Sequence, residues 1–179
     1  MFNTIGAQIS IDYRLTGLHF TLAAACASAN MAMSRALDLI RYGNCNMALT
    51  GGVDAPLCPT AFTAWLAMRI LSDSPDPQRC CLPFHRGRKG FSMGEGAAFF
   101  LFEEREHARR RGARIYAEVL GYGENSDAVH LTHSDPQREA EAIRMALDDA
   151  GIGPDQVDYI NAHGTATQVN DANETQAIK

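Results

Sequence analysis

One stretch near the start of the chain constrains its fold more than any other. Residues 21–43 begin as a run of small apolar side chains that ends at Cys26. The stretch continues with apolar residues at helical spacing, namely Met33, Ala36, Leu37 and Ile40. Gly43 follows where a helix C′ glycine belongs. The pattern predicts a strand, then Cys26, then a helix.

The predicted position of Cys26 has a chemical consequence. A thiol at the start of a helix lies near unpaired backbone N–H groups and the positive end of the helix dipole, which favour thiolate over thiol. That environment suits a nucleophile. A buried structural cysteine in an alanine-rich contact explains this stretch equally well, so the stretch alone leaves both interpretations open.

The composition is that of an ordinary globular chain. Of the 179 residues, 46% are hydrophobic and 21% charged, which allows about one domain with a sizeable core. The net charge of −5 argues against a general nucleic-acid binder. The basic cluster at 105–114 follows several glutamates and is interpreted as a solvated helix face. No apolar run is long enough for a membrane helix, so we expect no membrane partner.

The cysteines indicate a reducing compartment. There are five, an odd number, without regular spacing and without a secretory signal. The adjacent pair Cys80 and Cys81 lacks the spacing of a zinc site. We therefore predict a cytoplasmic protein without a disulfide framework.

Strand-like and helix-like patterns alternate along the rest of the chain. Strands are predicted at 46–53, 94–103, 114–121 and 157–162, and a glycine turn is expected to end the first of them. Helices are predicted at 60–71, 104–112, 135–150 and from 171 onward. Asp135, Pro136 and Gly151 supply the cap, first turn and end of the third helix. A long polar loop at 72–92 is expected to be functional or interfacial. The alternation predicts an α/β layered fold with at least partly parallel strand pairing, whereas residues 1–20 show no convincing strand.

His163 is the second candidate for chemistry. It lies between the apolar segment 157–162 and a glycine turn that also carries Thr165 and Thr167. The carboxyl end of a parallel strand is where α/β folds place catalytic groups. Alone, such a histidine is a core residue about as often as a catalyst, but with Cys26 it becomes a candidate partner for a thiolate. A strand, a reactive residue and a helix occur in this order twice, which indicates two similar halves.

Several ordered motifs resemble one family. AACAS at 24–28 followed by GGVDA resembles the nucleophile segment of β-ketoacyl synthases, and NAHGTAT with DANE resembles the family's first histidine motif. Between them, PFHRGRKGFSMGEGAAFFLFEE resembles the family's loop and following strand. The resemblance implies a thiolase-like layered α-β-α-β-α fold that is incomplete at both ends. Residues 1–179 would then form a partial ketosynthase domain, from the end of the N-terminal half to the start of the C-terminal half.

The resemblance also implies an activity, which is decarboxylative Claisen condensation of an acyl thioester with malonyl-acyl carrier protein in fatty acid or polyketide biosynthesis. Cys26 would carry the acyl group and His163 would stabilise the enolate. Thr165 and Thr167 match positions that meet the phosphopantetheine arm, and Glu174 matches a supporting carboxylate. No cofactor or metal is implied. The implied partners are acyl carrier protein and a second subunit, identical in a homodimer or related in a heterodimer.

Departures from the family pattern leave alternatives open. A second histidine, in a lysine motif, and a glycine-rich gating loop would lie beyond Lys179. His85 and Lys89 replace residues that are commonly aspartates, and Ala24 replaces a threonine, so a specialised synthase is as plausible as the housekeeping enzyme. A second hypothesis is a catalytically incomplete fragment that retains only a dimerisation surface. A third is a metal-dependent hydrolase built on Asp127, His130, His133 and Asp135.

Overall fold

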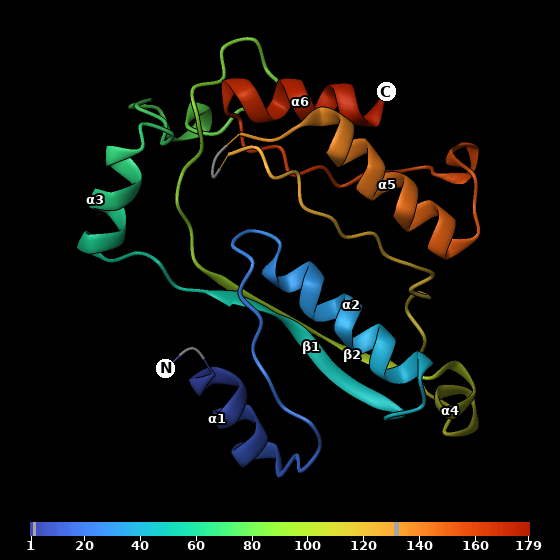
Figure 1. Cartoon of the computed structure of the whole chain (residues 1–179). Helices are drawn as coiled ribbons and strands as arrows, with labels where there is room; N and C mark the ends of the chain where they lie inside the picture. The colour runs from blue at the N-terminus through green and yellow to red at the C-terminus, as the bar shows by residue number, and fades with distance from the viewer. Residues whose placement is uncertain (2, 131–132) are drawn as a thin grey trace. The chain divides into compact units, whose positions relative to one another are not determined.

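The computed structural model of the chain describes residues 1, 3–130 and 133–179 (Figure 1). These residues form two compact units, each made of two separate segments. Unit 1 comprises Met1–Val53 and Ala97–Glu118, and unit 2 comprises Asp54–Gly96 and Val119–Lys179. Each unit is described by itself below.

Helix α2 (Ser28–Arg41) is the central helix of unit 1 and confirms the helix expected after Cys26. Its buried face contains Ala36 and Leu37 from the predicted apolar stripe, together with Ser34. Gly43, at φ 70°, lies directly after the C-cap residue Tyr42. Glycine adopts this left-handed conformation without the steric cost of a Cβ, so it terminates the helix at the expected point.

Strands β1 (Met47–Asp54) and β2 (Gly96–Glu103) form a two-stranded sheet beside α2 (Figure 1). They run antiparallel, because Glu104 N–H at the end of β2 donates to Asn46 O at the start of β1 (2.9 Å), whereas Gly51 lies against Ala98. Among the residues that the structure describes, the expected parallel pairing occurs as two isolated bridges, one between Ala24 and Cys26 and one between Leu71 and Phe91. The alternation of strand and helix patterns did not predict the relative direction of β1 and β2, because the segment that connects them folds in unit 2.

The paired glycines of β1 permit close packing. A Cβ on Gly51 would clash with the backbone of Ala98, and a Cβ on Gly52 would lie 2.8 Å from the Ala29 Cβ of α2. The predicted turn at these glycines is therefore wrong, because β1 continues through them to Asp54. Their predicted effect, close approach of neighbouring backbone, is confirmed.

Helix α4 (Arg105–Arg110) follows β2 directly and is held by carboxylates. Glu104 caps it by accepting from the N–H groups of Glu106 and His107, which lowers the pKa of the Glu104 carboxyl. Hydrogen bonds from Arg111 lower the pKa of Glu103 to about 2, and His107 also contacts this carboxylate. The basic cluster is thus paired with glutamates, as a solvated helix face should be.

Helix α1 (Thr4–Tyr13) was not predicted from the sequence. None of its residues is buried, and Ile5, Ile11 and Tyr13 are exposed. It lacks the one-sided apolar stripe that identifies a surface helix, which explains why periodicity did not reveal it.

The regular elements of unit 2 are mainly helices. They are α3 (Pro59–Ala67), α5 (Pro136–Ala150) and α6 (Gln168–Ile178), with short 3₁₀ turns η1 (Pro77–Arg79) and η2 (Pro154–Gln156). The predicted ends of α5 are confirmed, since Asp135 accepts from Gln137 N–H and Gly151 adopts φ 68°. Its inner face is only partly as expected, because Ile143 is 36% exposed. Gly121 and Gly123 lie directly against the α5 backbone instead.

Three predicted strands are wrong. Residues 114–121 and 157–162, and the run before Cys26, are not strands; only an isolated bridge between Ala24 and Cys26 occurs there. Their alternating or apolar patterns describe which faces would be buried, but a strand also needs a neighbouring backbone to hydrogen-bond with. Among the residues that the structure describes, these segments find no such ladder.

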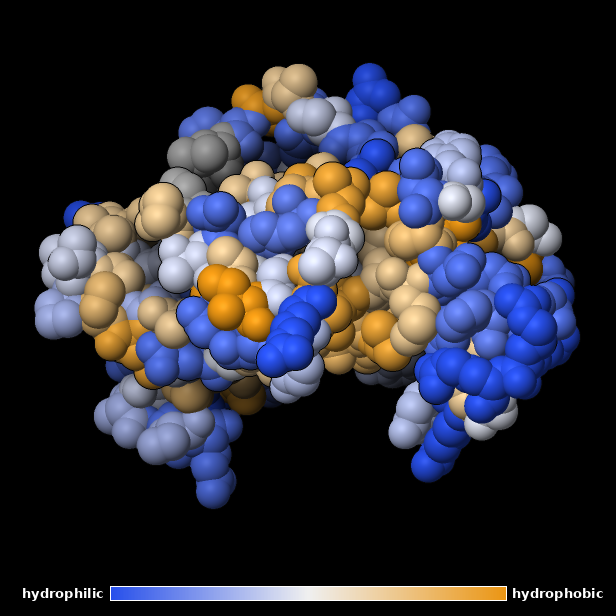
Figure 2. All heavy atoms as spheres, turned by 90° about the horizontal axis from the view of Figure 1, so that it is seen from below, coloured by the Kyte–Doolittle hydropathy of each residue, from blue (hydrophilic) through white to orange (hydrophobic). Residues whose placement is uncertain are grey.

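Apolar side chains remain at the surface of both units (Figure 2). On β2, Phe99, Phe100 and Leu101 are 41%, 55% and 53% exposed. Consecutive strand residues face opposite sides, so β2 is apolar on both faces, which is typical of strands inside layered α/β folds. In the part of the chain described, no helix is long and apolar enough to cross a membrane.

Candidate active site

Cys26 lies in a tight turn immediately before α2. Ala27 N–H donates to Ala24 O (3.0 Å), and Ser28 N–H donates to Ala25 O (3.2 Å). Ala25 adopts φ 48°, in the left-handed region that residues with a Cβ rarely occupy. The turn therefore presents Cys26 two residues before the first helical residue.

The thiol of Cys26 is free and the residue is exposed. The interpretation as a buried structural cysteine is therefore wrong. The expected position at the N-terminus of a helix is confirmed, with the N-terminal end of α2 directly behind the turn. That end presents the positive pole of the helix dipole, which favours a thiolate or an oxyanion nearby.

His163 is held through its backbone by Glu174 of α6. The two carboxylate oxygens of Glu174 accept from His163 N–H and Gly164 N–H, the latter at 2.8 Å. The imidazole itself is on an exposed residue. Glu174 thus fixes the main chain on which the imidazole is carried and leaves the ring available for a ligand.

Thr165 and Thr167 continue the same turn. Their hydroxyl oxygens lie 2.9 Å apart, and Thr167 Oγ1 accepts from Asn170 N–H (3.3 Å) as the N-cap of α6. Both residues are half-buried. The structure therefore brings His163, Thr165, Thr167 and Glu174 together at one end of α6, all within unit 2, whereas Cys26 belongs to unit 1.

Asp171 connects this turn to the loop around residue 84. The residue is 2% exposed; its Oδ1 accepts from Ala166 N–H (3.0 Å) and its Oδ2 from Phe84 N–H (2.6 Å). Ala166 and Phe84 adopt φ 60° and 61°, so one carboxylate binds the amides of two residues in an unfavourable conformation. Arg88 Nε lies 3.6 Å from the same carboxylate.

Arg88 adds further contacts to the turn. Its Nε donates to Thr167 O (2.9 Å) and its Nη2 to Gln168 O (2.8 Å). Gly90 N–H donates to Ala166 O (2.8 Å). The sequence analysis placed Asp171 in the DANE segment and at the start of a helix, which in fact begins at Gln168, and it gave Arg88 no role. An acidic residue in the first turn of a helix, following a glycine turn, was the signal that could have identified Asp171.

The two residues that depart from the resemblance in this loop have partners of their own. His85 Nδ1 accepts from Gly87 N–H (2.9 Å), the backbone contact that a short carboxylate makes in an Asx turn. Lys89 Nζ lies 3.3 Å from Asp73 Oδ1 at an exposed position. In this chain the loop therefore has a turn contact at His85 and an ion pair at Lys89.

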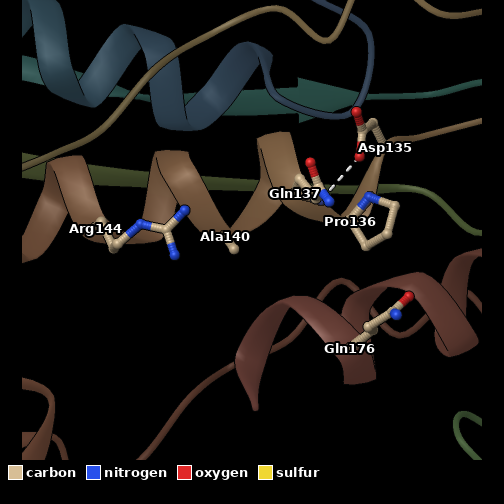
Figure 3. A pocket seen from close by; sticks show the side chains of 6 residues that line it. All are labelled: Asp135, Pro136, Gln137, Ala140, Arg144 and Gln176. Carbon is tan, nitrogen blue, oxygen red and sulfur yellow. Dashed lines mark hydrogen bonds between the residues drawn. The ribbon is translucent and has the colours of Figure 1, made fainter.

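A shallow pocket of about 340 Å³ lies between α5 and α6 (Figure 3). It is lined by Asp135, Pro136, Gln137, Ala140, Arg144 and Gln176. None of the four candidate residues of unit 2 lines it. We assign it no part in the chemistry.

The two aspartates of the hydrolase hypothesis bind backbone N–H groups, and its two histidines contact each other. Asp127 accepts from the N–H groups of Val129 and Asp135, and Asp135 caps α5. His130 and His133 contact each other, with their Nδ1 atoms 3.0 Å apart. Within residues 1, 3–130 and 133–179, no group of three or more histidine, cysteine or acidic side chains could hold a metal ion, so this hypothesis lacks a ligand set.

Comparison with known proteins identifies the family. The model of the β-ketoacyl synthase N-terminal domain matches residues 1–108, and the model of the C-terminal domain matches residues 116–179. The chain therefore belongs to the β-ketoacyl synthase family, as its motifs indicated.

Individual relatives agree with this assignment. The chain is 43% identical over 174 residues to 3-oxoacyl-[acyl-carrier-protein] synthase 2 of Staphylococcus aureus, covering 96% of the chain and 43% of the relative. It is 46% identical over 179 residues to nodulation protein E of Rhizobium meliloti, covering all of the chain and 43% of that protein. The chain thus spans less than half the length of the curated relatives it matches.

Solved structures confirm the fold class. A type II polyketide ketosynthase in complex with its acyl carrier protein matches 99% of the chain and 45% of its own length, with a TM-score of 0.96 and 37% identity. A β-ketoacyl synthase from Burkholderia phymatum matches 98% of the chain and 43% of its own length, with a TM-score of 0.94 and 36% identity. The chain has part of the α/β, thiolase-like fold of ketosynthases.

Proposed function

We propose that the protein containing this chain is a β-ketoacyl-[acyl-carrier-protein] synthase of fatty acid or polyketide biosynthesis. Within a chain of this family, the observation that carries the proposal is the exposed free thiol of Cys26 in a tight turn at the N-terminus of α2. The proposal names both pathways because the relatives include a 3-oxoacyl-[acyl-carrier-protein] synthase and a polyketide ketosynthase.

In the first step, the Cys26 thiolate attacks the carbonyl of an acyl thioester. The resulting oxyanion accepts a hydrogen bond from the Cys26 N–H and is stabilised by the helix N-terminus. The carbon–sulfur bond to the carrier then breaks, and the carrier thiolate leaves. The acyl group remains on Cys26 as a thioester, which keeps its carbonyl activated for the second step.

In the second step, malonyl-acyl carrier protein loses carbon dioxide, and the electron pair of the broken bond forms an enolate. His163 donates a hydrogen bond to the thioester oxygen and stabilises this charge. The enolate carbon attacks the acyl carbonyl on Cys26, the sulfur–acyl bond breaks, and the Cys26 thiolate is regenerated. The product is a β-ketoacyl chain on the carrier protein.

The remaining residues support these two. The adjacent hydroxyls of Thr165 and Thr167 bind the phosphopantetheine arm, and Glu174 holds the His163 backbone in place. Acyl carrier protein is the partner, in line with the solved complex of a related ketosynthase with its own carrier protein. A second subunit, identical or related, completes the enzyme, which acts in the cytoplasm.

The test is acylation of Cys26 in the intact protein, measured by peptide mass spectrometry after incubation with an acyl thioester. Cys26→Ser should abolish the acyl adduct. Cys58→Ser is the matched control, because Cys58 is also exposed and precedes helix α3. An adduct distributed equally over Cys26 and Cys58 would overturn the proposed nucleophile. A stable dimer without any acylation would favour the incomplete fragment.

His163 is tested separately. His163→Ala should leave Cys26 acylation within about twofold of wild type but should lower the decarboxylation of malonyl-acyl carrier protein by about 100-fold or more. Carbon dioxide release is measured with labelled malonyl thioester. Equal loss of both steps would show that His163 does not act specifically on the enolate.

A further inference from the structure

The turn that carries Cys26 is closed by a side chain that the sequence interpretation did not single out. Ser28 Oγ accepts from Ala24 N–H (2.8 Å) and donates to Ala25 O (2.7 Å). These bonds add to the two backbone hydrogen bonds within Ala24–Ser28. The hydroxyl of Ser28 therefore spans the turn on both sides of Ala25.

The hydroxyl serves the turn rather than the helix. Ser28 is the first residue of α2, and the N-cap residue Ala27 makes no side-chain cap. A capping hydroxyl accepts from an N–H further along its helix, whereas Ser28 Oγ contacts residues that precede it. Removing it should leave α2 intact, particularly since alanine has a higher helix propensity than serine.

The turn needs such a restraint because of Ala25. Its φ of 48° is unfavourable for a residue with a Cβ and persists only where the surroundings enforce it. Ala25 O accepts from both Ser28 N–H and Ser28 Oγ. The direction of the Ala25 carbonyl is therefore determined twice by one residue.

Fixing that carbonyl also fixes the Cys26 N–H. Ala25 C=O and Cys26 N–H belong to one planar trans peptide, in which they point in opposite directions. On the proposed function, the Cys26 N–H donates to the oxyanion formed during acyl transfer. We propose that Ser28 is a positioning residue of this enzyme, acting through its hydroxyl to orient the Cys26 amide toward the oxyanion; this inference rests on the proposed function.

Two reactions of Cys26 separate this role from a general structural one. Acylation by hexanoyl-N-acetylcysteamine passes through an oxyanion, whereas alkylation by iodoacetamide does not. In the intact protein, Ser28→Ala should lower the acylation rate of Cys26 by about tenfold or more, because a misdirected donor loses much of its contribution. The rate at which iodoacetamide alkylates Cys26 should change by less than about twofold, and the pH profile of that reaction should stay the same.

Two further variants test the hydroxyl itself. Ser28→Thr keeps the hydroxyl and should retain acylation within about threefold of wild type. Ser34→Ala is the matched control, because Ser34 Oγ donates to Met31 O (2.9 Å) in the same helix. It should leave both reactions unchanged. Ala25→Gly should lessen the loss caused by Ser28→Ala, since glycine adopts a positive φ without strain.

The outcomes are distinguishable. If wild-type Cys26 is not acylated, the proposed function fails and the inference with it. If wild type is acylated and Ser28→Ala reacts equally fast, only the role of Ser28 is overturned. Equal loss of acylation and alkylation in Ser28→Ala also overturns it, because the hydroxyl would then act on general folding. If Ser28→Ala does not fold, the acylation and alkylation rates are compared in the double variant with Ala25→Gly. The same difference between the two rates is then expected.

Discussion

Replacing Asp171 with asparagine tests the connection between the His163 turn and the loop around residue 84. Asparagine has the same size but offers one acceptor oxygen in place of two. It can satisfy either Ala166 N–H or Phe84 N–H, and its amide group then faces the other donor. The substitution also removes the charge opposite Arg88.

The magnitude follows from burial. The Asp171 side chain is 1% exposed, so an N–H left without an acceptor costs about 1–3 kcal/mol. Breaking a buried ion pair costs about 3–5 kcal/mol, and the Arg88 side chain, 16% exposed, can recover only part of its hydration. We therefore expect Asp171→Asn to lower the free energy of unfolding by about 3 kcal/mol.

The assay is urea unfolding of the intact protein. Asp158→Asn is the control, because Asp158 is exposed and should change the free energy of unfolding by less than about 0.5 kcal/mol. Arg88→Met should cost less in the Asp171→Asn background than alone, by about 1 kcal/mol or more. A change below about 1 kcal/mol for Asp171→Asn would refute the proposed connection.

Two further predictions concern unit 1. The pKa of Glu103 is lowered to about 2, so its carboxylate stabilises the fold fully above its unfolded pKa of about 4.3, and this stabilisation is lost as pH falls toward 2. Arg111→Met should flatten this part of the pH dependence of the urea midpoint, and an unchanged profile would contradict the assignment. Gly52→Ala should destabilise the protein by about 1–3 kcal/mol in thermal unfolding, because its Cβ would lie 2.8 Å from Ala29 Cβ. Gly94→Ala, with nothing within 4 Å of its Cβ, should be neutral, and equal effects of the two substitutions would contradict the packing argument.

Local chemistry explains why some features could be predicted from the sequence. The helix after Cys26, its end at Gly43, and the cap and end of α5 depend on residues within a few positions of one another. The contact between the Glu174 carboxylate and the backbone at His163 also joins residues that are close together along the chain. Motif order was sufficient to identify the family.

Features that depend on distant residues were less predictable. Apolar patterns at 114–121 and 157–162 suggested strands. A strand also requires a neighbouring strand to hydrogen-bond with, and the pattern does not specify which segment that would be. The antiparallel direction of β1 and β2 was missed because the connecting segment belongs to the other unit. Helix α1 carries no periodic signal at all.

The sequence by itself determined the family, the candidate nucleophile and the residues around His163, because these are encoded in short motifs with fixed spacing. Only the tertiary structure showed that Asp171 binds the amides of Phe84 and Ala166, and that Ser28 restrains Ala25 beside Cys26. The physical reason is that hydrogen bonds to backbone amides and carbonyls depend on the path of the chain. Side-chain identity alone does not specify which of them a carboxylate or hydroxyl will meet.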